Sequence, residues 1–161
     1  MKRLMMTAAR SAVLAAVLTA GAVPVMAQDA RLKAAVKADY DANLGALFDH
    51  FHRNPELSGM EVQTAARMAQ ELRALGYEVT TGVGGTGVVA VLKNGAGPTV
   101  MIRADMDGLP LLENSGLANA STARQVDSDG AEKPVMHACG HDVHITALVG
   151  TARQMAARKA N

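Results

Sequence analysis

Hydrophobic residues recur at helical spacing in three stretches of the chain. Between residues 30 and 51 they lie three or four positions apart, which predicts an amphipathic helix that ends before Pro55. Residues 58–61 (Ser-Gly-Met-Glu) have the pattern of a capping box, in which a Ser hydroxyl and a Glu carboxylate satisfy free amides at a helix start. We expect that second helix to end at Gly76, because glycine favours the left-handed conformation of a helix stop. Residues 145–158 predict a third helix with a basic end.

Runs of β-branched residues predict strands at 77–81, 88–92 and 99–104. The glycines of residues 82–87 match the pattern GxGxxG, which binds dinucleotides where a helix follows. A strand pattern follows here, so we interpret these residues as a hairpin turn. Residues 116–134 are small and polar and predict a loop. Helices that flank strands indicate the α/β class.

The first 27 residues have the pattern of a bacterial signal peptide. Three basic residues precede the apolar run 11–23, and Val25 and Ala27 are small residues suited to positions −3 and −1 of a cleavage site. A retained membrane helix is disfavoured, because the run is shorter than the roughly 20 residues that span a bilayer. We therefore predict a signal peptide at 1–27, a periplasmic or secreted chain at 28–161, and no stable membrane anchor.

Charge and cysteine content narrow the function classes. The chain has 16 basic and 15 acidic residues and a net charge of +1, which argues against a nucleic-acid partner. Cys139 is the only cysteine, so an internal disulfide is excluded. Its thiol is either free or a metal ligand.

Residues 136–144 (Met-His-Ala-Cys-Gly-His-Asp-Val-His) concentrate the chemistry of the chain. A thiolate and imidazoles are the preferred ligands of zinc-like ions, and Cys139 and His141 would point to the same side of an extended segment. Asp142 could orient a metal-binding imidazole through a hydrogen bond without binding the metal itself. Two alternatives stay open, namely a buried cysteine beside solvated histidines and a Cys–His nucleophile pair.

Two further pairs of polar residues have ambiguous spacing. Asp105 and Asp107 follow a predicted strand, where ligands collect in α/β sheets, although Asp-x-Asp-Gly also forms ordinary turns. His50 and His52 lie two positions apart, so a regular helix would not let both bind one ion. Imidazoles there are also explained by the favourable field of a helix C-terminus.

Taken together, four segments resemble the amidohydrolase branch of the M20 metallopeptidases, the aminoacylase-, hippurate- and auxin-conjugate-type hydrolases. The similar segments are residues 52–58 with Glu61, 86–90, 102–110 and 136–144, and they occur in family order. Gly108 stands where the family more often has Ala.

The resemblance implies the N-terminal part of a zinc-exopeptidase-like, phosphorylase/hydrolase-like catalytic domain over residues 28–161. It implies a site for two divalent ions, Zn or Mn, with Cys139 as the bridging ligand and His141 as a ligand of one ion. Asp107 matches a residue that orients a ligand without binding the metal. The implied reaction is hydrolysis of amide bonds in N-acyl amino acids or peptide-like substrates.

In the family, the general-base Glu, the other ligands and a dimerisation domain follow the segment that ends here at Asn161, and full-length members are expected to be homodimers. We therefore expect the 161-residue chain to be poorly stable and inactive alone. The alternative is a non-catalytic remnant that binds metal weakly through Cys139 and His141.

Overall fold

The computed structural model describes residues 25–159, and the chain divides into two units between Ala34 and Ala35. Helix α1 (Val25–Asp39) crosses from one unit to the other. The predicted signal peptide lies outside the described residues except for its last three positions, which begin α1. Within residues 25–159, no helix is both long and apolar enough to cross a membrane.

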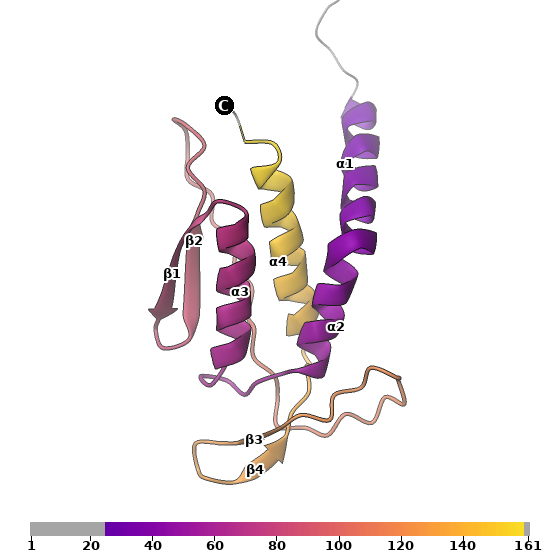
Figure 1. The fold of residues 1–161 in the computed structure, drawn as a ribbon, viewed down its shortest axis with the longest axis vertical. Coiled ribbons are helices and arrows are strands. Elements are labelled where there is room, and N and C mark those ends of the chain that lie inside the picture. Colours follow the sequence, from indigo (N-terminus) through magenta and orange to yellow (C-terminus); the bar gives the residue numbers. More distant parts are fainter. Residues whose placement is uncertain (1–24, 160–161) are drawn as a thin grey trace, which may run out of the picture. The chain divides into compact units, whose positions relative to one another are not determined.

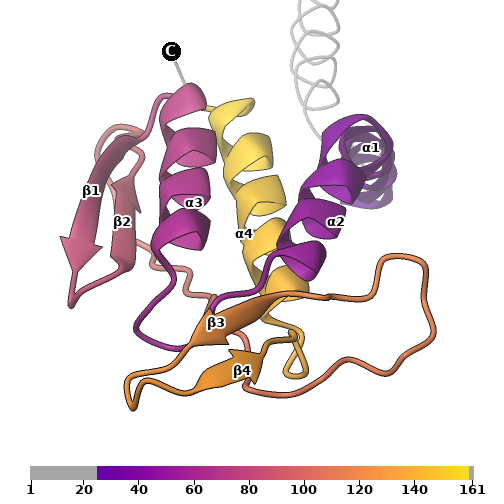
Figure 2. The same cartoon turned by 60° about the horizontal axis from the view of Figure 1, so that its bottom comes forward.

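Three helices build the second unit together with the end of α1. A π-helical turn, η1 (Tyr40–Leu44), joins α1 to α2 (Gly45–Arg53), so the helix predicted over 30–51 is confirmed with one irregular turn. α3 (Val62–Ala74) and α4 (His141–Ala156) are the other two predicted helices. In Figures 1 and 2, α4 lies between α3 and α2, and it contacts both.

The start of α3 is capped differently from the prediction. The Glu56 carboxylate accepts hydrogen bonds from the amides of Gln63 at 3.0 Å and Thr64 at 2.7 Å, as a helix cap does. Glu61 is the N-cap residue and accepts from the amide of Gly59 at 2.9 Å, not from Ser58, and the Ser58 side chain makes none of the bonds, so the predicted capping box is wrong. The helix stops before Gly76, whose φ is +82°.

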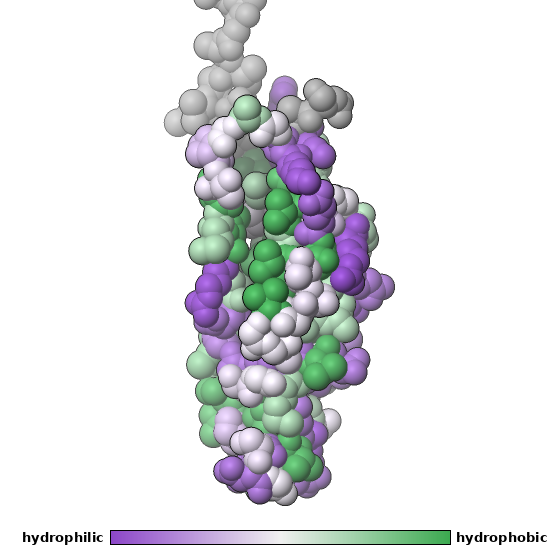
Figure 3. Space-filling model, turned by 90° about the vertical axis from the view of Figure 1, so that its left-hand side faces the viewer, coloured by the Kyte–Doolittle hydropathy of each residue, from purple (hydrophilic) through white to green (hydrophobic). Residues whose placement is uncertain are grey.

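Strands β1 (Glu78–Val83) and β2 (Gly87–Val91) pair antiparallel and pack against α3, which confirms the hairpin predicted around the glycine-rich turn. Residues alternate between the two faces of a strand, and Val89 and Val91 lie on the exposed face. Figure 3 views this side of the molecule, where hydrophobic surface lies among polar residues.

The loop predicted at residues 116–134 and the strand predicted at 99–104 are both wrong. Residues 116–134 contain a second antiparallel hairpin, β3 (Arg124–Val126) with β4 (Glu132–Pro134). Its turn is closed by the Asp127 carboxylate, which accepts from the amides of Asp129 at 3.0 Å and Ala131 at 2.9 Å. Conversely, residues 99–104 form no strand, because no other described segment pairs with them.

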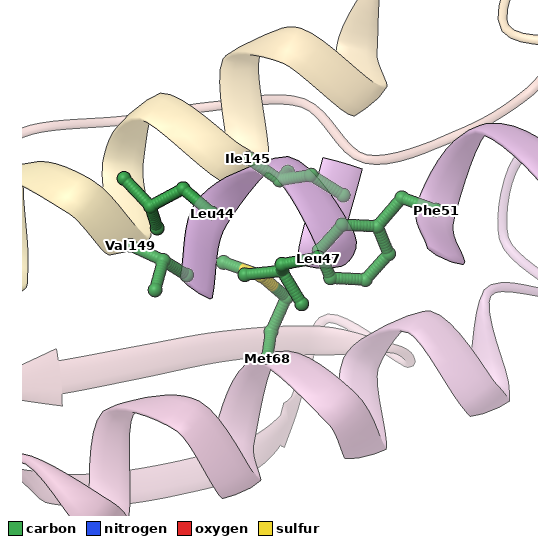
Figure 4. Close-up of a cluster of buried hydrophobic side chains, with 6 residues drawn as sticks. All are labelled: Leu44, Leu47, Phe51, Met68, Ile145 and Val149. Carbon is green, nitrogen blue, oxygen red and sulfur yellow. The ribbon is translucent and has the colours of Figure 1, made fainter. Parts of the chain in front are cut away.

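The hydrophobic core lies between the helices. Figure 4 shows side chains from η1, α2, α3 and α4 that converge there: Leu44, Leu47, Phe51, Met68, Ile145 and Val149. Ala104 and Met106 of the extended segment pack against this cluster at every second position. The intervening positions 105 and 107 are thereby turned away from the core, which leaves their carboxylates available for polar contacts.

Candidate metal centre

Backbone hydrogen bonds bring three distant segments side by side. The amide of Gly108 donates to the carbonyl of Glu56 at 2.6 Å. Leu109 and Met136 exchange two bonds, of 2.8 Å and 3.1 Å. This ladder anchors the residue just before it, Asp107, and the residue just after it, His137, at one end of α4.

The Cys-Gly-His segment is a tight turn, so the extended conformation predicted for it is wrong. Cys139 is exposed, and Gly140 has φ +74°, in the left-handed region that favours glycine. His141 is the first residue of α4. The chain changes direction immediately before α4 begins. Gly140 can adopt the left-handed conformation of this bend without the strain that a side chain would cause. The thiol and the imidazole therefore belong to a turn and a helix terminus respectively.

His141 is held by Asp107. Its Nδ1 lies 2.9 Å from the Asp107 carbonyl oxygen and 3.0 Å from Oδ1 of the same residue. A carbonyl oxygen can only accept, so Nδ1 donates to it, and in the tautomer with the proton on Nδ1 the lone pair lies on Nε2. That tautomer suits a metal ligand, and a carboxylate behind a ligating histidine is the usual arrangement in metal sites.

His52 lies between two buried carboxylates. Its Nδ1 is 2.7 Å from Oδ2 of Asp142, and its Nε2 is 3.3 Å from Oε1 of Glu113, outside hydrogen-bond geometry. The side chains of Asp142 and Glu113 are 3% and 2% exposed. The imidazole that Asp142 contacts is thus His52, 90 residues earlier in the chain.

His137 is the most isolated of these histidines. It is buried, and neither ring nitrogen has a hydrogen-bond partner. Burial lowers its pKa below the usual value, although the Asp142 carboxylate opposes that shift. Burial thus disfavours the charged form of the ring.

Two of the sequence candidates lie apart from this cluster. Asp105 forms an ion pair with Arg103 on the surface. His50 is separate from His52, and burial together with Arg67 lowers its pKa. Of the carboxylate pair, only Asp107 contacts a predicted ligand, and of the helix pair, only His52 contacts Asp142.

Sequence reasoning missed Glu113 and its contact with His52. Glu113 lies in a polar stretch 61 positions after His52, and no local spacing links the two residues. The only available signal is its chemistry: it is the one acidic residue between Asp107 and Asp127.

The chemistry of the two predicted donors, Cys139 and His141, suits a metal ion. An exposed thiol and an imidazole with its Nε2 free are suitable ligands, and Asp107 supplies the outer support. Residues 25–159 contain no group of three or more His, Cys, Asp or Glu side chains arranged to hold an ion. The described residues thus offer two donors rather than a complete ligand shell.

The sequence relatives of this chain are hydrolases. The model of peptidase family M20/M25/M40 matches residues 101–161. A hippurate hydrolase of Campylobacter jejuni is 44% identical over 111 residues, which are 68% of this chain and 27% of that protein. Thermostable carboxypeptidase 2 of Saccharolobus solfataricus is 47% identical over 63% of this chain and 24% of its own. An N-acetyl-L-cysteine deacetylase of Bacillus subtilis is 39% identical over 64% of this chain and 23% of its own.

A solved structure agrees with these matches. The Bacillus subtilis YXEP protein, described as a dinuclear metal binding peptidase from the M20 family, superposes with a TM-score of 0.63 at 33% identity. The alignment covers 80% of this chain and 32% of that one, and this chain spans about a quarter of the length of the curated relatives it matches. The ordered motifs, the metal-suited turn and these similarities lead to one conclusion: the chain belongs to the M20 family of peptidases and amidohydrolases.

Proposed function

We propose that this chain carries part of a two-metal site for the hydrolysis of amide bonds in N-acyl amino acids or peptide-like substrates. In this proposal Cys139 would hold both ions and His141 would hold one of them through Nε2. The observation that carries it is the contact of His141 Nδ1 with Asp107, which leaves Nε2 available for a metal.

The chemistry of the site divides between the metals and the protein. Bound divalent ions polarise an amide carbonyl and lower the pKa of a water molecule. Asp107 keeps the proton on Nδ1 of His141 and fixes the plane of its ring. Gly140 sets the turn that separates the thiol from the helix start. The ion, Zn or Mn, and the export of the mature chain to the periplasm are parts of the same proposal.

Metal titration of the purified chain tests the ligand assignment. We expect Co²⁺ to bind with a thiolate-to-metal absorption band, and Cys139→Ser to abolish that band. The Co²⁺ affinity of Cys139→Ser should fall by more than roughly 10- to 100-fold, which is the usual loss when a residue that only supports a ligand is removed. The control is His144→Ala, which removes a neighbouring exposed imidazole that the proposal leaves without a role. Equal binding by the wild-type chain and Cys139→Ser would refute the assignment.

An activity assay separates the two candidate functions. Hydrolysis of hippurate or N-acetyl amino acids with added Zn²⁺ or Mn²⁺ would identify an active hydrolase. Metal binding without turnover is the result we expect for the 161-residue chain, because its described residues supply two donors. The alternative, a non-catalytic remnant with weak metal binding, predicts that same result for any longer product of the gene, whereas the hydrolase proposal predicts turnover there.

A further inference from the structure

His52 connects two parts of the site that are far apart in sequence. It stands near the end of α2, Asp142 in the first turn of α4, and Glu113 in the segment between them. The His52 side chain is 14% exposed and packs beside Phe48, with ring centroids 5.5 Å apart. The ring is thus confined, so its two nitrogens face fixed partners.

On one side, His52 holds the start of α4. Asp142 uses Oδ2 for His52 and Oδ1 for the amide of Val143, at 2.7 Å and 2.8 Å. Both oxygens of this buried carboxylate are therefore engaged, and hydrogen bonds to a charged group are among the stronger ones. Asp142 directly follows His141, so any displacement of Asp142 moves the proposed ligand as well.

On the other side, His52 faces the segment Glu113–Ser121. The Glu113 carboxylate accepts from the Ser115 hydroxyl and the Ser121 amide, each at 2.6 Å, which folds this segment around it. The Ser121 hydroxyl in turn donates to the Val135 carbonyl at 2.8 Å, two residues before His137. The folded segment and the start of α4 therefore meet at one imidazole.

We propose that His52 is a positioning residue for the metal centre. Through Nδ1 and Asp142 it fixes the start of α4, and with it His141 and the Cys139–Gly140 turn. Through Nε2 it faces Glu113 and the folded segment Glu113–Ser121. The positioning of the helix start stands on the contacts alone, and its effect on metal affinity rests on the proposed function.

A matched pair of substitutions separates the two nitrogens. The amide nitrogen of Asn takes roughly the place of Nδ1, so His52→Asn keeps a donor toward Asp142. The amide nitrogen of Gln takes roughly the place of Nε2, so His52→Gln keeps the side toward Glu113 and loses the Asp142 bond. His52→Ala removes both.

The first readout is amide hydrogen exchange in the full metal-free chain. We expect His52→Gln and His52→Ala to speed exchange at Val143 and His144 by about tenfold, while His52→Asn stays close to the wild type. Val149 in the middle of α4 is the internal reference and should change little. Equal effects of the Asn and Gln variants, including unfolding of both, would overturn the proposal. Acceleration along the whole of α4 would do the same, because it indicates a packing role alone.

The second readout is Co²⁺ affinity. We expect the Gln and Ala variants to lose about 10- to 100-fold and the Asn variant to stay within a few-fold of the wild type. If the wild-type chain binds no Co²⁺, the proposed function fails, while the exchange pattern still decides the positioning role. If Co²⁺ binds equally to all four proteins, the link between His52 and the metal ligands is overturned.

Discussion

The histidines of this chain differ because of their neighbours, although the sequence places them in two tight groups. His141 faces Asp107, His52 faces Asp142, and His137 faces no hydrogen-bond partner. Sequence reasoning anticipated Asp107 as a residue that orients a ligand, and the structure places it against His141, although its role in catalysis stays a prediction. It did not anticipate Glu113, because a contact across 61 positions depends on the completed fold.

Gly108 is a residue whose identity the packing explains. A Cβ built there would lie 2.8 Å from Val135 Cγ1 and 2.9 Å from Pro55 Cβ, closer than real Cβ contacts. We predict that Gly108→Ala lowers the free energy of unfolding by about 1–3 kcal/mol through overpacking. Urea denaturation of both proteins measures it.

Gly150→Ala is the control for that experiment. Its added Cβ approaches the tip of the Leu44 side chain, and a helix-interior alanine offsets the contact by about 1 kcal/mol. A Gly108→Ala protein as stable as the wild type would show that the ladder between Glu56 and Gly108 moves to accommodate a methyl group.

Glu113 predicts a pH dependence of stability. The Ser115 hydroxyl, the Ser121 amide and His52 lower the pKa of its carboxyl below the usual 4.5, against the opposing effect of burial. The ionised form is thus favoured in the folded chain, so its stabilising effect is complete above the unfolded pKa and is lost as pH falls through the folded one. We expect the stability difference between the wild type and Glu113→Gln to be largest near pH 6 and to shrink toward pH 3.

Urea denaturation at several pH values in that range provides the measurement. If the stability difference between the wild type and Glu113→Gln grew as the pH fell, the predicted direction of the pH dependence would be wrong. Glu132→Gln on the exposed β3–β4 hairpin is the control and should show no comparable gap at any pH, because surface ion pairs contribute little.

At the scale of the element, local sequence patterns predicted the helices and strands whose formation depends on neighbouring residues. The helices and the β1–β2 hairpin follow from spacing and turn residues, and all are present. The strand predicted at 99–104 fails because a strand needs a partner, which spacing does not report. The β3–β4 hairpin is polar on both sides, so hydrophobic alternation could not reveal it.

Mutation of the α3 cap tests whether a distant residue or the local sequence pattern caps this helix. The structure assigns the cap to Glu56, whereas the local pattern assigned it to Ser58. We predict that Glu56→Ala lowers the free energy of unfolding by about 1–2 kcal/mol, the usual cost of a lost cap, and that Ser58→Ala changes it little. Thermal or urea denaturation of the two variants distinguishes them, and the reverse order would restore the capping-box assignment.

At the scale of the whole molecule, the described core is small and one apolar stretch is uncovered. Val100, Met101 and Ile102 are 75%, 85% and 51% exposed, and they pair with no strand in residues 25–159. Extended, exposed apolar backbone is a template for association with other chains.

We therefore predict that the purified 161-residue chain self-associates as its concentration rises, and that Met101→Lys reduces this association without lowering the melting temperature. Sedimentation velocity over a range of concentrations measures it. Lys93→Ala, an exposed change outside the apolar stretch, serves as the comparison. A wild-type chain that stays monomeric at high concentration would count against the prediction.

The π-helical turn η1 has a consequence for the register of the helices around it. A π turn holds about one residue more than an α turn, and η1 places this extra residue between the α-helical segments α1 and α2. Removing one residue from this turn would rotate Asp39 by about 100° relative to α2. Asp39 would then leave the Arg153 guanidinium of α4, whose Nε it now contacts at 2.8 Å and 2.9 Å. The extra residue thus sets the rotation of α1 relative to α2. With it, the apolar side chains of α2 face the core while the Asp39 carboxylate faces α4.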